Sequence, residues 1–425
     1  MARKMKDSGI EWIGEIPTDF SLYKLKYLLS SPLCYGANES GTLYSDILPR
    51  YIRITDISPN GTLKNSGMLS LDESSAQNYM LHEGDILFAR SGATVGKSFI
   101  YHNYYGRAAY AGYLIKASFN RLVLPEFVYY YTCSSAYEIW KNSIFIQSTI
   151  QNIGADRYSN LPISVPNSID KQLRIVRYLN NFCSKFDAII YNLQTSIEDY
   201  KKLKQAIITQ AVTKGVRGER EIKESKLPWA SKIPKAWNTC AIRHIMFECK
   251  ERTKDGHEEQ LSVTQQFGII KSSDASIANP SLSLDDWRIV AIGDIVFNKY
   301  KAHSGVFFVS PFSGIVTFNY SVYRCFPNCY AKYFEYQYKT HGCISEFRTR
   351  MHGVGNSISP LYTKDLMKIK VVCPPLDEQK EISNYLDAKC AEIDKLIAKK
   401  EQLVIELESY KKSLIYEVVT GKREV

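Results

Sequence analysis

An internal repeat with a period of about 207 residues limits the folds that this chain can adopt. A segment starting at Asp170 recurs at Asp377, and both copies continue with Gln, Ile, Tyr and Leu at the same spacing. The register holds without a gap for more than forty residues, from Asp170 to Thr213 and from Asp377 to Thr420. A repeat of this length predicts two copies of one structural unit, related by a pseudo-twofold.

The duplication also reaches the beginning and middle of each half. Trp-Ile-Gly-Glu-Ile-Pro at 12–17 is echoed at 229–234, and Gly-Asp-Ile-Leu-Phe at 84–88 is echoed at 293–297. Near the end of each half, Ser-Thr-Ile at 148–150 corresponds to Asn-Ser-Ile at 356–358. Between these anchors the two halves differ almost completely. The sequence therefore predicts a repeated frame that carries two different surfaces.

The repeated segments from about 169 and 376 have the apolar spacing of long helices. Apolar residues recur in steps of three and four, and neither segment contains Gly or Pro before Gly215 and Gly421. A helix of about 44 residues is about 66 Å long. Because the apolar seam is narrow and long, we expect the two helices to pair as an antiparallel coiled coil. The alternative is that each helix packs separately on its own domain.

The remaining segments, 12–165 and 229–372, are predicted to be mixed α/β domains. Short β-rich runs bounded by turn residues are found at 51–54, 85–89 and 294–298. Two expected helices, at 125–140 and 329–347, carry Tyr and Phe on one face. The fold class is thus α/β (α+β), with two similar domains alternating with two long helices. The predicted boundaries are 1–165 and 216–372 for the domains, and 166–215 and 373–425 for the helices.

The composition suits a polyanionic partner. With 54 Lys and Arg against 44 Asp and Glu, the formal net charge is +10, and 30 tyrosines add groups that can contact phosphates, sugars and base edges. The ten cysteines are scattered, and the irregular spacing of Cys325, Cys329, His341 and Cys343 argues against a zinc site. Without a secretory signal or a long apolar run, a cytoplasmic protein with no membrane segment is expected.

The glycine-rich run at 92–98 comes near to a nucleotide-binding loop but departs from it. Ser91 occupies the position of the first glycine, and an aromatic, strand-like segment follows where a phosphate loop would open a helix. We interpret the loop as a DNA contact, with a simple tight turn as the alternative. No adenine-methylation signature is found, since Asn279-Pro280 resembles one only superficially. A protein without catalytic residues, cofactor or metal is therefore expected.

Candidate DNA-binding residues are those that can bridge guanine, bridge adenine, or contact phosphates. In the first half they are Arg90, Ser91, Thr94, Lys97, Tyr101, His102, Tyr104, Arg107, Gln147, Thr149, Gln151 and Arg157. In the second half they are Lys299, Tyr300, Lys301, His303, Arg348, Arg350, His352 and Asn356. For each of them the alternative is an ordinary solvated side chain.

Three motifs together carry a resemblance to a known family. The opening at 12–17, the run Gly-Asp-Ile-Leu-Phe-Ala-Arg-Ser-Gly-Ala-Thr-Val-Gly-Lys at 84–97, and the Asp-x-Gln helix starts resemble specificity subunits of type I restriction-modification enzymes, or HsdS. The resemblance implies a non-catalytic subunit whose two target-recognition domains each bind half of a bipartite sequence in double-stranded DNA. It also implies that the helices set the gap and hold two methyltransferase (modification) subunits, with restriction (translocase) subunits joining the complex.

The second half departs from the family pattern after Phe297, where Asn-Lys-Tyr-Lys-Ala-His-Ser-Gly follows. Residue-by-residue transfer from the first loop to the second is therefore unsafe. Two other functions stay open at this point. One is a standalone DNA-binding scaffold or regulator with the same duplicated frame, and the other is a nucleotide-dependent transferase built on 92–98.

Overall fold

The computed structural model describes residues 3–58, 61–92, 94–146, 152–265, 267–274, 284, 286–351 and 360–425. The chain forms two compact units. Unit 1 comprises Met1–Gln194 with Gln402–Val425, and unit 2 comprises Thr195–Glu401. Gln194 and Glu401 are separated by the repeat period, so the chain is divided at equivalent points of its two copies.

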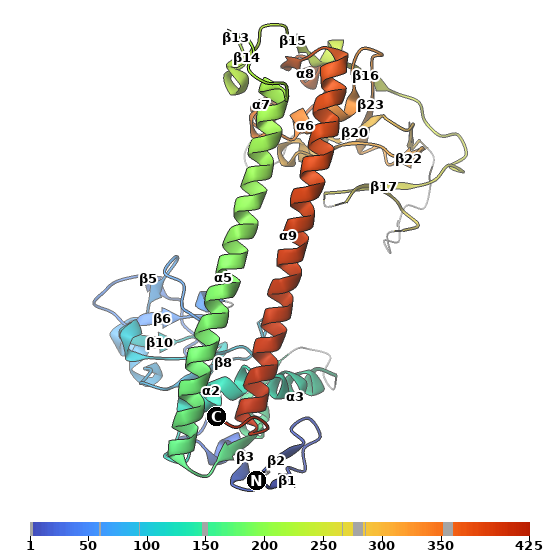
Figure 1. Cartoon of the computed structure of the whole chain (residues 1–425). Helices are drawn as coiled ribbons and strands as arrows, with labels where there is room; N and C mark the ends of the chain where they lie inside the picture. Colours follow the sequence, from blue (N-terminus) through green and yellow to red (C-terminus); the bar gives the residue numbers. More distant parts are fainter. Residues whose placement is uncertain are drawn as a thin grey trace. The chain divides into compact units, whose positions relative to one another are not determined.

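Unit 1 is built around a four-stranded sheet in the order β4-β11-β8-β9, of which β8 is labelled in Figure 1. Its strands are β4 (Cys34–Tyr35), β11 (Leu114–Ala117), β8 (Ile86–Ala89) and β9 (Ser98–Ile100). A second sheet contains β10 (Ala108–Tyr110), β6 (Arg50–Ile52), β7 (Leu69–Ser70) and β5 (Thr42–Leu43). Two strand pairs complete the unit, β1 (Met5–Asp7) with β2 (Glu15–Pro17), and β12 (Pro162–Pro166) with β3 (Phe20–Lys24). Its shorter helices are α1 (Glu73–Ala76), α2 (Pro125–Thr132), α3 (Ser135–Ile146) and α4 (Ala155–Ser159).

Unit 2 repeats the main sheet in the order β16-β23-β20-β21. Its strands are β16 (Met246–Cys249), β23 (Tyr320–Cys325), β20 (Ile295–Asn298) and β21 (Phe307–Val309). The flanking pairs recur as β13 (Ile222–Glu224) with β14 (Lys232–Pro234), and β15 (Asn238–Ala241) with β24 (Lys370–Cys373). The shorter helices are α6 (Ala331–Tyr338), α7 (His341–Arg350) and α8 (Thr363–Leu366).

The two units differ in their outer strands. Where unit 1 has its second four-stranded sheet, the described part of unit 2 has two strand pairs. These are β17 (Leu261–Thr264) with β18 (Gly268–Lys271), and β19 (Arg288–Val290) with β22 (Gly314–Val316). The expected combination of a common frame and different surfaces is therefore confirmed.

The repeated Gly-Asp-Ile-Leu-Phe motif forms the inner strand that separates two cores. In β8, Ile86 and Phe88 lie in the core next to the long helices, whereas Leu87 and Ala89 lie in the core beneath the second sheet. The same alternation recurs in β20. Successive side chains of a strand point to opposite faces, so a short strand of apolar residues contributes side chains to both cores.

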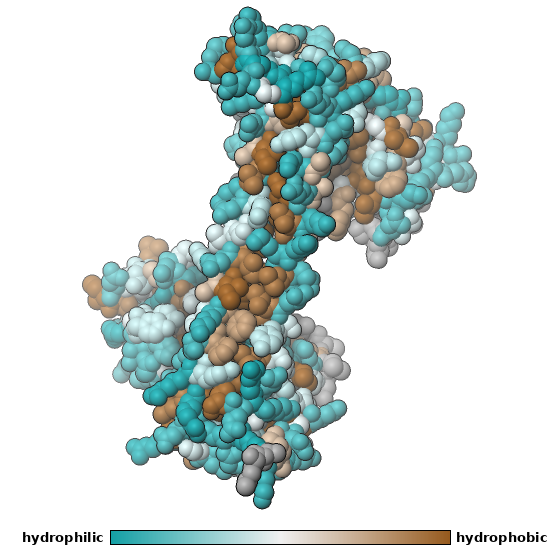
Figure 2. Space-filling view, viewed as in Figure 1, coloured by the Kyte–Doolittle hydropathy of each residue, from teal (hydrophilic) through white to brown (hydrophobic). Residues whose placement is uncertain are grey.

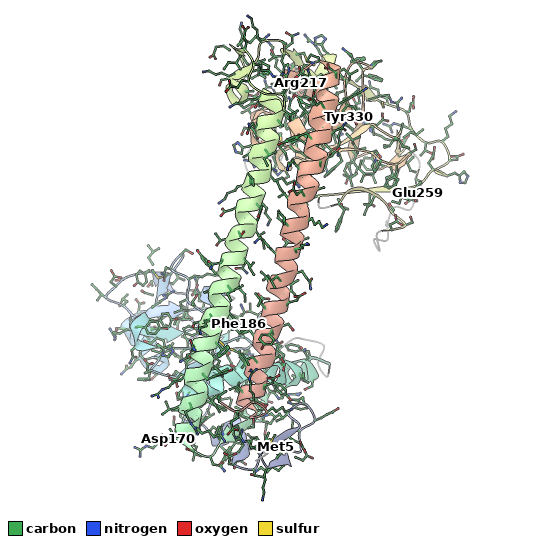
Figure 3. All side chains as sticks on the ribbon, in the orientation of Figure 1. Met5, Asp170, Phe186, Arg217, Glu259 and Tyr330 are labelled. Atoms are coloured by element: carbon green, nitrogen blue, oxygen red, sulfur yellow. The ribbon has the colours of Figure 1, made fainter. Side chains whose placement is uncertain are left out.

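The two long helices are α5 (Ile169–Lys214) and α9 (Leu376–Val419). In unit 1 the ring of Phe186, labelled in Figure 3, packs 5.6 Å from the ring of Tyr410. Beside it, Lys411 Nζ lies 2.6 Å from Asp187 Oδ1. In unit 2 the same bridge is formed with the helices exchanged, because Lys204 Nζ lies 2.6 Å from Asp394 Oδ2.

Within each unit the early part of one helix therefore packs against the late part of the other. This is the contact expected of two antiparallel helices that are related by a repeat. Ile197, Ile393 and Ile397 form a buried apolar cluster between the helices of unit 2. The expected coiled-coil pairing is confirmed, and the alternative of separately packed helices is wrong.

Both helices end at the predicted glycines. Gly215 has φ +81° and Gly421 has φ +74°, which is the left-handed conformation that commonly ends a helix. A Cβ on Gly421 would lie 2.5 Å from Pro17 Cγ and 2.9 Å from Phe20 Cζ. Position 421 therefore requires glycine for two reasons, the positive φ and the lack of space for a Cβ.

The repeated glutamines attach each helix to its domain. Gln172 is fully buried, and its side-chain amide donates to the carbonyls of Leu122 and Pro166 and accepts from the Leu124 N–H at 2.8 Å. Gln379 accepts from the Tyr330 N–H at 2.7 Å and donates to the Pro374 carbonyl at 2.8 Å. Both glutamines bind backbone atoms, so their contacts do not depend on the side chains of the attached domain.

Replacing Gln172 with Leu is expected to lower the free energy of unfolding of unit 1 by at least about 3 kcal/mol. One buried backbone N–H and two carbonyls would lose their partners, at about 1 to 3 kcal/mol for each unsatisfied group. Denaturant unfolding measures this loss. The matched control is Gln205→Leu at an exposed position of the same helix, which should change little. Equal stability of the two variants would contradict the role assigned to Gln172.

Within the described ranges, no helix combines the length and the apolar character needed to cross a membrane. Apolar side chains are nevertheless exposed along α5 and α9, as Figure 2 shows. Ile189 and Tyr410 are exposed in unit 1, and Leu203 and Leu396 in unit 2. These four residues are two repeat-related pairs, since Ile189 corresponds to Leu396 and Leu203 to Tyr410.

Candidate nucleic-acid interface

In unit 1, four of the candidate residues lie on the turn that joins β8 to β9. The turn is closed by backbone hydrogen bonds from Ala89 N–H to Lys97 O at 2.8 Å and from Gly96 N–H to Ala89 O at 2.9 Å. Arg90, Ser91, Thr94 and Lys97 are all half-buried on it. The turn leads into a strand and not into a helix, so its amide groups are not arranged as in a nucleotide-binding loop.

Two other segments hold this turn in place. From α3, the Tyr137 hydroxyl donates to Gly96 O at 2.6 Å. From the segment before α4, the Ile153 N–H donates to Arg90 O at 2.9 Å, and Asn152 forms a bridge with Ser91. Arg157 is exposed on α4, so the structure brings this late candidate into the segment that braces the turn.

The other candidates of unit 1 lie beyond the opposite end of β9. Tyr101 is buried, its hydroxyl donates to Gly106 O, and burial raises its pKa. His102 Nδ1 lies 2.5 Å from Glu83 Oε1, and Arg107 forms an ion pair with Glu73. Tyr104 is exposed, at 76%, and Arg107 is exposed as well although it has an acidic partner.

Glu83 therefore accepts two hydrogen bonds at this end of the strand. The side chain of His102 and the Asn103 N–H both approach it, and together they lower the pKa of the Glu83 carboxyl. Because Tyr101, His102 and Arg107 already have partners within the protein, this group is less free to bind DNA than the β8–β9 turn. The structure does not bring the two groups together.

In unit 2 the equivalent turn is a 3-10 segment, η7 (Lys299–Ser304). The Asn298 side chain accepts from the Tyr300 and Lys301 N–H groups at 3.0 and 3.2 Å and so starts the segment. Tyr300 and Lys301 are exposed, and Lys299 and His303 are half-buried. The different sequence after Phe297 thus gives this loop another conformation than the β8–β9 turn. Its position after the inner strand is the same in both units.

Helix α7 lies beside η7, as α3 lies beside the turn of unit 1. Buried Phe347 of α7 packs 5.0 Å from Phe307, the first residue of β21. Arg348 is exposed on α7, and Arg350 forms an ion pair with Glu346 at 2.7 Å. The structure therefore places Arg348 on the helix that supports η7, with its side chain accessible.

The remaining candidates, Gln147, Thr149, Gln151, His352 and Asn356, lie outside the described residues. Among the residues that are described, no group of three or more His, Cys, Asp or Glu side chains is arranged to hold a metal ion. Tyr35 lies next to the β8–β9 turn, and the sequence analysis did not identify it. Its ring lies 5.0 Å from the Arg90 guanidinium carbon, but it is 55 positions away in a short strand without a recognisable motif.

Comparison with known proteins agrees with this architecture. A family model described as "Type I restriction modification DNA specificity domain" matches residues 44–199 and 264–407. A protein of Methanocaldococcus jannaschii, named as the specificity subunit of type I restriction enzyme MjaX, is 25% identical over 97% of this chain and 96% of its own length.

A solved structure shows the same fold. A chain from a study of complex assembly and conformational transition of the type I R-M system superposes with a TM-score of 0.69 at 14% identity, covering 96% of this chain and 99% of its own. The HsdS subunit of Thermoanaerobacter tengcongensis gives a TM-score of 0.47 at 14% identity, covering 96% and 98%.

Proposed function

Since the chain belongs to the type I restriction-modification DNA specificity family, we propose that it is the sequence-specific DNA-recognition subunit of a type I restriction-modification complex. It contributes recognition and no catalytic step. The observation that carries this proposal is the pair of turns after β8 and β20. Each turn follows the same strand of the same frame and is braced by an equivalent helix, yet the two carry different side chains. Such a pair suits the recognition of a target with two unlike halves.

Within this function we assign residues 1–165 and 216–372 as the two target-recognition domains, and 166–215 and 373–425 as the helical spacers. The primary DNA-binding surface of the first domain is the turn with Arg90, Ser91, Thr94 and Lys97, together with Arg157. That of the second is η7 with Arg348. We assign the exposed Tyr104 to contact with phosphates beside the half-site. Roles in DNA binding for Gln147, Thr149, Gln151, His352 and Asn356 stay predictions.

The exposed apolar residues of the long helices support two docking sites for one partner. Ile189 with Tyr410, and Leu396 with Leu203, are equivalent under the repeat, so each unit offers a related pair of apolar side chains. Two equivalent surfaces allow two copies of the same protein to bind. We therefore assign two methyltransferase subunits as partners, with restriction subunits joining the complete complex in the cytoplasm. The standalone regulator would leave these surfaces uncovered, and the relatives found do not favour it.

The chain co-expressed with its methyltransferase is expected to bind double-stranded DNA with a preference for one split, asymmetric sequence. Specific binding exceeds non-specific binding by about a thousandfold or more in systems of this kind. Competition binding measures the preference, and mapping the methylated bases identifies the sequence. The chain alone is the control for the contribution of the partner. Binding without preference for any split sequence would sink the proposal.

A further inference from the structure

On the β8–β9 turn, the Arg90 side chain contacts an aromatic ring. Its guanidinium carbon lies 5.0 Å from the centroid of the Tyr35 ring. Among the described residues, it forms no ion pair or side-chain hydrogen bond, whereas Arg107, Arg324 and Arg350 each contact a carboxylate. The five N–H donors of Arg90 are therefore available to a ligand, while the guanidinium carbon lies over an aromatic ring.

Both partners of this contact are held by their backbones. Arg90 N–H donates to Tyr113 O at 3.0 Å, and Arg90 O accepts from Ile153 N–H at 2.9 Å. Tyr35 lies opposite Ile115 in the main sheet, and its hydroxyl accepts from the Ala155 N–H at 3.0 Å. The backbone of Arg90 and the ring of Tyr35 are thus fixed, and the ring contact restricts the guanidinium, so the Arg90 side chain loses less freedom when it binds.

We propose that Arg90 recognises a guanine in the half-site bound by unit 1, and that Tyr35 is the positioning residue that orients its guanidinium. A planar guanidinium can donate two parallel hydrogen bonds to O6 and N7 of guanine, which no other base accepts in the same way. Stacking on a ring leaves the edge of the fork free for these bonds. This inference rests on the proposed function and names one base contact within it.

Unit 2 lacks this arrangement. The pairing of Phe88 with Ile115 corresponds to that of Phe297 with Ser321, so Arg90 corresponds to Lys299. On the neighbouring strand Cys249 pairs with Val322, which places Lys250 at the position of Tyr35. Two ammonium groups can attract phosphates but cannot form a stacked planar fork. The Tyr35–Arg90 pair is therefore specific to the half-site of unit 1.

The test measures base discrimination by the assembled complex. Duplexes carrying each base pair at each position of the mapped target are bound by wild type, Arg90→Ala, Tyr35→Leu, Tyr35→Phe and the double variant Arg90→Ala/Tyr35→Leu. Arg90→Ala is expected to lose about tenfold to a hundredfold discrimination at one position, where wild type requires guanine. Tyr35→Leu should lose most of the same discrimination, and Tyr35→Phe, which keeps the ring, should retain it. The double variant should be no worse than Arg90→Ala.

Several outcomes would overturn the inference. If Arg90→Ala weakened binding to all sequences equally and lowered the salt dependence by about one phosphate contact, Arg90 would bind the backbone. Full discrimination by Tyr35→Leu would remove the positioning role. Tyr35 is 42% exposed, so its replacement spares the core, and denaturant unfolding verifies this. Lys299→Ala is the matched control, which should affect only the other half-site. A wild-type complex without any split preference would instead contradict the proposed function.

Discussion

A chain whose residues 12–165 are replaced by those of another specificity subunit is expected to recognise a new first half-site and the original second half-site. Unit 1 and unit 2 each have their own cores, and the variable strands of unit 1 pack on its own main sheet. Discrimination between the old and new first half-sites should reverse by about a thousandfold, the difference between specific and non-specific binding. Mapping methylated bases with the assembled complex measures both halves in one experiment.

The glutamine contacts explain why such an exchange should fold. Gln172 binds only the backbone of the domain, at Leu122, Leu124 and Pro166, so an incoming domain with the same backbone course satisfies it. The reciprocal exchange of 229–372 is the control, and it should change only the second half-site. A change in both half-sites after a single exchange would show that the domains do not act independently.

Lengthening both long helices by four residues is expected to increase the gap between the half-sites by about one to two base pairs. Four helical residues add about 6 Å, and a base pair adds about 3.4 Å along the duplex. The insertions belong after Gln194 and after Glu401, because these positions are equivalent under the repeat and lie between the compact units. The half-sites themselves should stay unchanged. The measurement is binding to a series of duplexes that differ only in the gap.

The same design contains its own controls. Removing four residues at the same positions should shorten the preferred gap by the same amount. Four residues turn a helix slightly beyond one full revolution, which can disturb the apolar seam. An insertion of seven residues keeps the seam in phase and should lengthen the gap by about three base pairs. An unchanged gap in the stably folded seven-residue variant would contradict the spacer role of the helices.

Much of the frame was determined by the sequence alone, because its signals are periodic or local. The steps of three and four in the apolar residues predicted α5 and α9, and Gly215 and Gly421 marked their ends. The repeat predicted that one unit would occur twice. It also matched Asp187 with Asp394 and Lys204 with Lys411, and these four residues form the two ion pairs between the helices. These features depend on spacing along one chain, which a sequence displays directly.

Which candidate residues share a surface is set by contacts between segments that are distant in the sequence. Arg90 and Tyr104 are close in sequence, yet a strand separates their positions, whereas Tyr35 reaches Arg90 from a distant strand. Carboxylates engage His102 and Arg107, whereas Arg90 has no such partner among the described residues. Which charges stay available depends on contacts between distant segments, and no local pattern in the chain encodes those contacts.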